Sequence, residues 1–358
     1  MNEFSQTLME WHDETNKREL PWKGERNPYR IWLSEIILQQ TRVEQGIGYY
    51  LKFIENYPTV NDLASSPDNE VFKHWEGLGY YSRCRNLLHS ARTIVTQFNG
   101  QFPETYDALL KLKGIGSYTA AAIASFAYDM PHAVVDGNVL RVLARYFGIR
   151  EAINEPAVKQ KLSKLAQTLL VQMRPAAYNQ AIMDFGATVC KPRNPVCNSC
   201  PLMPGCNAFK ENLVEKLPFK ALKAPRKQRF FAYYILKHSG KIWIRERKEK
   251  DIWRHLHEFF LLEVESEKSL EESKLKGHIK NKGWMIKSQK VFASTTKQIL
   301  THQEIFAAFV LVEMEQKPLL QQEGIWVNGS DLTKIAFPKT INNFLGYIMK
   351  DRPFIFCK

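Results

Sequence analysis

The sequence predicts a mainly α-helical N-terminal region followed by an α+β domain, and three changes along the chain carry this prediction. Up to about residue 215, apolar residues recur three and four positions apart, as in amphipathic helices. Residues 216–229 are rich in Lys and Pro without apolar periodicity, as in an interdomain linker. Beyond them, short aromatic and β-branched runs predict strands, and residues 337–350 predict a closing helix. The strand runs are residues 230–236, 241–246, 258–264 and 304–314.

The composition fits a two-domain protein with a polyanionic partner. A chain of 358 residues, 44% of them hydrophobic, is long enough for two cores. A formal charge of +13 favours nucleic acid as the partner, although charge alone does not prove it. The N-terminus lacks a signal-peptide pattern, and no apolar run reaches the roughly 18 residues of a membrane span. We therefore expect a cytoplasmic protein, nucleoid-associated if bacterial, with no membrane partner.

Two helices are expected before residue 40. Residues 1–20 place aromatic and apolar side chains on one face, which predicts a helix that ends before Pro21. The second helix begins at Asn27 and Pro28, a capping residue followed by a proline at the first helical position. It continues through the apolar run IWLSEIILQ, which carries a single acidic residue.

That acidic residue, Glu35, is the candidate general acid. It is the only ionisable residue between Arg30 and Arg42, and its neighbours are Trp, Leu and Ile. A carboxyl group in such surroundings is partly desolvated, which raises its pKa and lets it hold a proton near neutral pH. The alternative is a glutamate on the solvent-facing side of an amphipathic helix.

Two glycines and an aspartate mark the starts of two further helices. Gly114 and Gly116 lie between two apolar helical runs, so the backbone can turn sharply and approach a ligand closely. The helix start that follows offers unpaired N–H groups to a phosphate. Asp136 precedes an amphipathic run that ends at Gly148, which places this carboxylate at a helix start. The alternatives are an ordinary turn and an ordinary helix cap.

Four of the six cysteines lie close together in a proline-rich stretch, which indicates a metal site rather than disulfides. Four thiolates in one short loop can bind an iron–sulfur cubane. Structural zinc is the alternative, although such sites usually have two C-x-x-C pairs and this stretch has one. The candidate ligands are Cys190, Cys197, Cys200 and Cys206.

These motifs resemble those of the DNA glycosylase superfamily that includes endonuclease III. The sequence LKGIGSYTAAAI followed by VDGNVLRVL resembles the helix-hairpin-helix and catalytic aspartate of that superfamily. Residues 32–43, WLSEIILQQTRV, are very similar to the catalytic helix of the adenine-specific mismatch glycosylases, the MutY family. The resemblance implies a monomeric adenine DNA glycosylase of base excision repair. It would act on double-stranded DNA in which adenine is paired with 8-oxoguanine or guanine.

The resemblance also implies a cofactor and a division of the chain. The cysteine spacing matches the [4Fe–4S] loop of the endonuclease III and MutY families. The C-terminal part resembles a Nudix-like domain but has no hydrolase box of clustered glutamates, so this domain would recognise DNA rather than react. The resemblance implies a helical glycosylase region at residues 1–215, a linker at 216–229 and a Nudix-like domain at 230–358. Within the helical region, residues from about 24 to 132 would form a six-helix part. Residues 1–23 and 133–215 would form the iron–sulfur part.

Single residues receive roles from the same resemblance. Glu35 would protonate adenine, and Asp136, with Asn138 beside it, would stabilise the oxocarbenium-like sugar. Tyr118 stands where bifunctional relatives have a lysine nucleophile, so no Schiff base is expected. The matching DNA-binding positions are Gln40, Tyr80, Gly114, Gly116, Thr301 and His302, and the matching pocket positions are Trp22, Lys23 and Gln180.

The loop expected to contact 8-oxoguanine departs from the family pattern. Where the family has Phe-Ser-His, this chain has Leu300, Thr301 and His302, which keeps a hydroxyl and an imidazole. The alternative for the last two residues is that they only end a strand and cap its turn.

Two other function classes stay open from the sequence. A bifunctional glycosylase and lyase of the endonuclease III type would share the helical region and the cysteine loop, but Tyr118 and the C-terminal domain disfavour it. A non-catalytic iron–sulfur DNA-binding protein would require neither Glu35 nor Asp136. Substitutions of these two carboxylates that leave DNA affinity intact would separate the enzyme from the binding protein.

Overall fold

The computed structural model describes residues 2–222 and 224–351, and it divides into two compact units. The first, called the helical unit here, contains Met1–Ser65 and Arg85–Lys223. The second, called the sheet unit, contains Ser66–Cys84 and Ala224–Lys358. A helical region and a sheet-containing domain confirm the fold class that the sequence predicts.

The helical unit consists of helices, with long connections before α2 (residues 15–27) and before α12 (residues 189–206). Pro28 begins its second helix, and the Asn27 side chain accepts hydrogen bonds from the N–H groups of Tyr29 and Arg30, as the sequence predicts. The helices are α1 (Glu3–Glu14), α2 (Pro28–Leu38), α3 (Val43–Asn56), α4 (Val60–Ser65), α6 (Ser82–Phe98, whose first turn belongs to the sheet unit), α7 (Tyr106–Leu110), α8 (Ser117–Tyr128), α9 (Gly137–Tyr146), α10 (Pro156–Leu169), α11 (Pro175–Thr188) and α12 (Asn207–Lys210).

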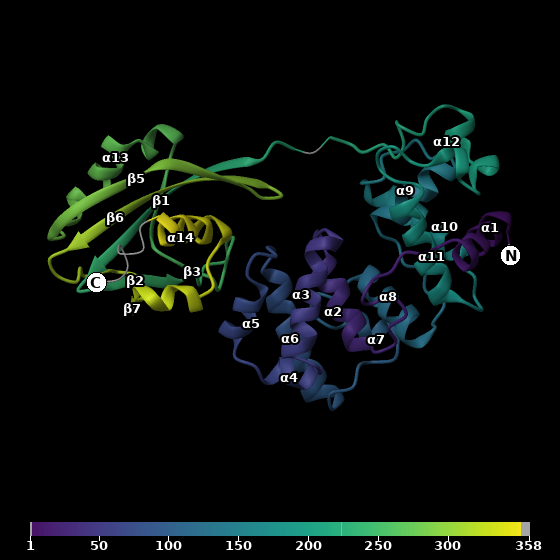
Figure 1. Cartoon of the computed structure of the whole chain (residues 1–358), viewed down its shortest axis with the longest axis horizontal. Coiled ribbons are helices and arrows are strands. Elements are labelled where there is room, and N and C mark those ends of the chain that lie inside the picture. The colour runs from purple at the N-terminus through teal and green to yellow at the C-terminus, as the bar shows by residue number, and fades with distance from the viewer. Residues whose placement is uncertain (1, 223, 352–358) are drawn as a thin grey trace. The chain divides into compact units, whose positions relative to one another are not determined.

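The first helix packs against elements from much later in the chain. Phe4 and Leu8 of α1 share a buried core with residues of α9, α10 and α11, among them Phe185. Figure 1 shows α1, in purple, beside α10 and α11, in teal. The helix ends at Glu14, earlier than the sequence predicts, because Asn16 and Arg18 leave it to hydrogen-bond Asp184.

A glycine turn joins α7 to α8. Gly114 has a φ of +83°, and a Cβ at this position would lie 2.6 Å from the Cβ of Asn86. Only glycine fits this backbone conformation and this close approach without strain. Gly116 then caps α8, whose first N–H groups have no side-chain cap. The sharp turn before a helix start is therefore present as the sequence predicts.

The sheet unit is built on one mixed sheet in the order β3-β2-β1-β6-β5. The central strands β1 and β6 are parallel, with Lys227 opposite Gln303 and Arg229 opposite Ile305. The other pairs are antiparallel, and β4 and β7 pair with β1 and β2. The strands are β1 (Lys227–His238), β2 (Lys241–Glu246), β3 (His257–Glu258), β4 (Phe260–Val264), β5 (Ile286–Ile299), β6 (Gln303–Met314) and β7 (Ile325–Asn328), and the helices are α5 (Asp68–Trp75), α13 (Glu272–His278) and α14 (Lys339–Asp351).

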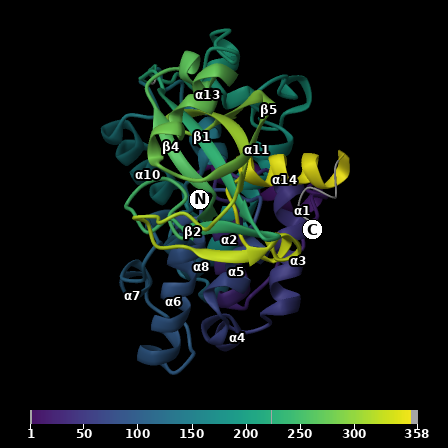
Figure 2. The ribbon, with the colours of Figure 1, turned by 90° about the vertical axis from the view of Figure 1, so that its left-hand side faces the viewer.

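The two faces of the sheet are covered by different helices (Figure 1, Figure 2). On one face, Phe309 of β6 stacks on Phe344 of α14 with ring centroids 4.0 Å apart. On the other face, the Tyr234 hydroxyl donates to the backbone oxygen of Leu275 in α13 at 2.9 Å. Alternate residues of β1 therefore enter two separate cores, as a strand buried on both sides requires.

The sequence prediction located the buried strands and missed the exposed ones. The predicted runs correspond to β1, β2, β3 with β4, and β6, and the predicted closing helix corresponds to α14. Strand β5 at the end of the sheet is largely polar, so it lacks the apolar pattern of a buried strand. Within residues 2–222 and 224–351, none of the helices is both long and apolar enough to span a membrane.

Candidate active site

One large cavity in the helical unit collects most of the predicted site residues. Its volume is about 1440 Å³, and its walls come from the chain before α2, from α2 itself, from the starts of α8 and α9, and from α11. The predicted residues that line it are Trp22, Lys23, Glu35, Gln40, Gly116, Tyr118, Asp136, Asn138 and Gln180. Residues as far apart in the sequence as Trp22 and Gln180 thus meet at one site.

Glu35 lies on α2 with only 6% of its surface exposed. Burial raises the pKa of Glu35 to about 7, although a hydrogen bond from Tyr118 acts in the opposite direction. The charge of Asp136 raises the pKa of Glu35 further. This carboxyl group can therefore hold a proton near neutral pH and release it to a basic atom in the cavity.

Asp136 caps the start of α9, as the sequence predicts. Its Oδ1 accepts hydrogen bonds from the backbone N–H groups of Asn138 and Val139, each at 2.8 Å. Its Oδ2 accepts from the Asn138 amide at 2.7 Å, and the Asn138 oxygen accepts from Arg141 at 2.8 Å. Burial raises the pKa of Asp136, although these hydrogen bonds favour its charged form.

A third carboxyl group, Asp184, was missed by the sequence reasoning; it pairs with Arg18 and Lys23 of the cavity wall. It is fully buried on α11 and accepts from Asn16 at 2.9 Å and Arg18 at 2.7 Å, with Lys23 at 3.2 Å. Burial alone would raise the pKa of Asp184, but hydrogen bonds from Asn16, Arg18 and Gln180 lower it below the usual value. Asp184 follows Gln180 by one helical turn, and this spacing could have identified it.

The cysteine loop lies against α9. Cys190, Cys197, Cys200 and Cys206 line one small pocket together with Arg145, whose side chain is buried. Arg145 donates to the sulfur of Cys190 at 3.5 Å and to backbone oxygens of the loop and of Leu217. Among the residues described, no three His, Cys, Asp or Glu side chains are grouped so as to hold a single metal ion. Four thiols around one pocket do fit the ligand set of a cubane, which takes one cysteine per iron.

The remaining predicted DNA-binding residues lie outside the cavity. Gly114 belongs to the turn before α8. Tyr80, Thr301 and His302 belong to the sheet unit, where the Tyr80 hydroxyl lies 2.6 Å from the hydroxyl of Thr301. Tyr80 has a φ of 47° and is 44% exposed, and the guanidinium of Arg83 lies 5.6 Å from the centroid of its ring.

Family models match both parts of the chain. Residues 33–168 match the model described as "HhH-GPD superfamily base excision DNA repair protein", and residues 231–346 match that of the NUDIX domain. The match to the first model contains Glu35, Tyr118 and Asp136.

Curated relatives cover nearly the whole chain. The adenine DNA glycosylase of Buchnera aphidicola subsp. Schizaphis graminum is 33% identical over 351 residues, which are 96% of this chain and 97% of the relative. The adenine DNA glycosylase of Homo sapiens is 44% identical over 214 residues, which are 57% of this chain and 39% of the relative.

Solved structures resemble the helical part. A thermostable thymine-DNA glycosylase superposes with a TM-score of 0.54 at 32% identity, covering 58% of this chain and 95% of that one. An endonuclease III bound to DNA superposes with a TM-score of 0.51 at 24% identity, covering 59% and 95%, and this likeness concerns the fold alone.

Proposed function

The chain belongs to the adenine DNA glycosylase family and is a DNA glycosylase. From this premise we propose that it hydrolyses the N-glycosidic bond of adenine paired with 8-oxoguanine or guanine. The observation that carries the proposal is the pair of carboxyl groups in one cavity, with the pKa of Glu35 raised to about 7 by burial. Two carboxyl groups in different environments are the arrangement that cleavage of a glycosidic bond requires. The protein would act as a monomer on double-stranded DNA.

The substrate nucleotide must leave the duplex, because the bond to be cleaved cannot be reached inside the stacked helix. A cavity of about 1440 Å³ has room for a flipped nucleoside. Trp22 and Gln180 supply an aromatic face and an amide to the base, and Lys23 supplies a positive charge at the cavity wall. The exposed N–H groups at the start of α8, after Gly114 and Gly116, would bind a phosphate of the flipped strand.

The chemistry then divides between the two carboxyl groups. Glu35 donates its proton to a ring nitrogen of adenine, so that the base leaves as a neutral molecule when the bond to the sugar breaks. Asp136, whose charged form accepts hydrogen bonds from Asn138 and Val139, stabilises the positive charge that develops on the sugar. A water molecule adds to the sugar carbon, and the product is an abasic site. Tyr118 hydrogen-bonds Glu35 and supplies no amine, and the ammonium of Lys23 is paired with Asp184, so the enzyme would be monofunctional.

The pH dependence of excision tests the role of Glu35. The protonated form is the active one, and its fraction falls about tenfold for each pH unit above a pKa of about 7. The single-turnover rate on an adenine:8-oxoguanine duplex should therefore be roughly 100-fold lower at pH 9 than at pH 6. On the acidic side the rate should fall again as Asp136 takes up a proton. A rate that stays constant between pH 6 and pH 9 would mean that Glu35 is not the acid.

The cofactor proposed for this chain is a [4Fe–4S] cluster held by Cys190, Cys197, Cys200 and Cys206. The support is that these four thiols line one pocket beside the buried guanidinium of Arg145. The cluster would stabilise the loop by joining its four cysteines and would take no part in the hydrolysis. Lys191 and Arg193 of this loop would then face DNA phosphates.

We expect the purified protein to be brown and to contain about four irons per chain. Metal analysis combined with the visible absorption spectrum measures both. One zinc per chain with no visible absorbance would contradict the proposal, since a structural zinc site also uses four thiolates.

The sheet unit would identify the base opposite adenine. When adenine leaves the stack, its former partner becomes accessible to contact from the protein. The oxidised guanine differs from guanine by an oxygen at C8 and a hydrogen at N7, so polar groups at that edge can distinguish them. Thr301 and His302 offer a hydroxyl and an imidazole, and Tyr80 lies in hydrogen-bonding contact with Thr301.

A further inference from the structure

The turn that presents Thr301 and His302 lies between β5 and β6 and is called the reading turn here (residues 300–303). The Leu300 N–H donates to the Gln303 carbonyl at 2.8 Å, which closes the turn. The Lys227 N–H at the start of β1 donates to the His302 carbonyl at 3.0 Å. Backbone pairing also holds the base of the outgoing strand, where Gln303 lies opposite Lys227 of β1 and Glu304 lies opposite Ile299 of β5.

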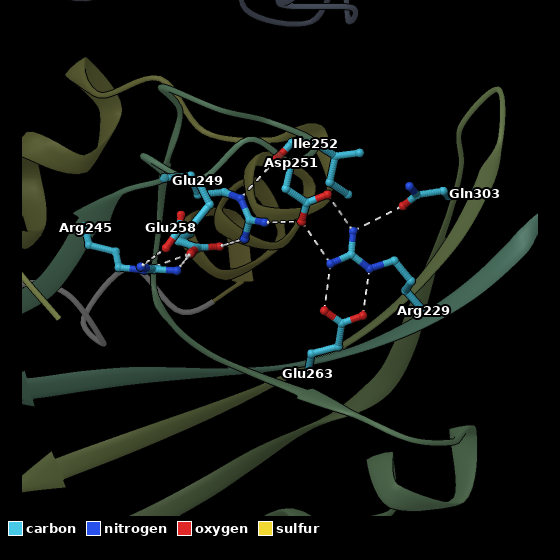
Figure 3. Close-up of polar contacts among 9 residues, drawn as sticks. Arg229, Arg245, Glu249, Asp251, Ile252, Glu258, Glu263 and Gln303 are labelled. Carbon is cyan, nitrogen blue, oxygen red and sulfur yellow. Dashed lines mark hydrogen bonds and ion pairs between the residues drawn. The ribbon is translucent and has the colours of Figure 1, made fainter. Parts of the chain in front are cut away.

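A side chain, that of Arg229 in β1, also contacts this base. Its guanidinium donates to the Gln303 side-chain oxygen at 3.2 Å, as Figure 3 shows. It also donates twice to Asp251, each at 2.9 Å, and twice to Glu263, at 2.7 Å and 2.6 Å. These five hydrogen bonds use all five N–H donors of the guanidinium. Only 11% of the Arg229 side chain is exposed, so the contacts are largely shielded from solvent.

The arginine is itself fixed in orientation. One face of its guanidinium lies 4.8 Å from the ring centroid of Phe231. The guanidinium of Arg247 donates to the carboxylate of Asp251 at 2.9 Å. Arg247 also forms an ion pair with the fully buried Glu258. Arg245 extends the same network from Glu258 to the exposed carboxylate of Glu249 (Figure 3). The donor that reaches Gln303 therefore comes from a planar group with no freedom to rotate.

We propose that Arg229 is a positioning residue for recognition of the opposite base, and that it acts through Gln303. Their hydrogen bond adds a side-chain contact to the backbone pairing at the first residue of β6, directly after Thr301 and His302, and so limits the movement of the reading turn. Polar recognition of one extra oxygen and one extra hydrogen depends on placement within a fraction of an ångström, so loosening this bond lowers discrimination rather than chemistry. This inference rests on the proposed function, because it concerns preference for 8-oxoguanine over guanine.

Variants of the full-length protein separate this role from a general effect on folding. Gln303→Ala removes the acceptor and leaves Arg229 with both of its carboxylates. Arg229→Lys removes the planar fork, since an ammonium has three donors in a different geometry. Gln303→Glu keeps an acceptor oxygen at the same reach and serves as the rescue. Glu249→Ala, at the exposed far end of the same network, is the matched control.

The measurement is the single-turnover rate of adenine release opposite 8-oxoguanine and opposite guanine, at one salt concentration. We expect Gln303→Ala and Arg229→Lys to lower the ratio of the two rates by about tenfold, with the rate opposite guanine unchanged. Gln303→Glu and Glu249→Ala should keep the ratio of the unmodified protein. An unchanged ratio in Gln303→Ala, or an equal fall of both rates, would overturn the inference. If the unmodified protein itself shows no preference, the proposed recognition of the opposite base fails instead.

Discussion

Replacement of Glu35 by glutamine is expected to lower the single-turnover rate of adenine excision by about 10²- to 10⁴-fold, the usual contribution of general acid catalysis. The amide keeps the shape of the side chain but has no acidic proton to donate to the base. Binding to DNA that contains the mispair should be largely unchanged, because Glu35 is buried in the cavity and is not one of the groups proposed to bind phosphate. Rapid-quench kinetics and a DNA-binding titration measure the two effects separately.

Thermal unfolding gives an independent check on the same variant. The pKa of Glu35 is about 7 in the folded protein and near 4.5 as its ordinary value, so the folded state loses stability as the pH rises between these values. A glutamine at this position does not ionise, so the variant does not lose this stability as the pH rises. The Tm of Glu35→Gln at pH 8 should therefore be higher than that of the unmodified protein, and the difference should vanish below pH 4.5.

The matched control for this prediction is Glu44→Gln, which makes the same chemical change on the exposed surface of α3. We expect this variant to keep both its excision rate and its Tm. If Glu35→Gln kept most of its excision rate, Glu35 would be an ordinary buried residue of α2 and the proposed acid would have to be another group.

The double variant Thr301→Ala with His302→Ala is expected to lower the preference for 8-oxoguanine over guanine by about tenfold to a hundredfold. Two well-placed hydrogen bonds contribute roughly 1–3 kcal/mol to discrimination between bases, and this variant removes both side chains proposed to make them. Excision opposite guanine should change much less, because the cavity with Glu35 and Asp136 is untouched. The ratio of single-turnover rates on the two duplexes measures the effect, at one salt concentration so that phosphate contacts contribute equally.

Thr333→Ala is the control for this second prediction, since it removes a threonine hydroxyl elsewhere in the sheet unit, one that donates to the Ser330 carbonyl at 3.0 Å. It should keep the preference of the unmodified protein. Equal preference in the double variant would mean that Thr301 and His302 only end a strand and cap its turn.

Local signals in the sequence were sufficient for much of the fold and site. Asn27 and Asp136 start helices because their side chains accept the first backbone N–H groups, and such a signal spans only a few residues. The desolvation of Glu35 was also visible, because one acidic residue stands in a long apolar run. The sequence did not show that the pKa of Asp136 is raised, because burial by distant elements outweighs the local hydrogen bonds.

Contacts between distant segments could not be predicted in the same way. Asp184 meets Arg18 across 166 positions, and this pair exists only because α1 packs on α11. The grouping of residues 66–84 with the sheet unit depends on contacts such as that between the Phe337 N–H and Glu76, which lie 261 positions apart. The contact between Arg229 and Gln303 requires the parallel register of β1 and β6, which no local pattern specifies.

The most direct test of the central claim is incubation of the full-length protein with duplexes that carry adenine opposite 8-oxoguanine, guanine or thymine. Abasic sites are scored by strand cleavage with and without alkali. We expect abasic sites from the first two duplexes and none from the adenine:thymine duplex, with cleavage only after alkali because Tyr118 supplies no amine. No abasic sites in any duplex, equal release opposite thymine, or strand cleavage without alkali would contradict a monofunctional adenine glycosylase specific for mispairs.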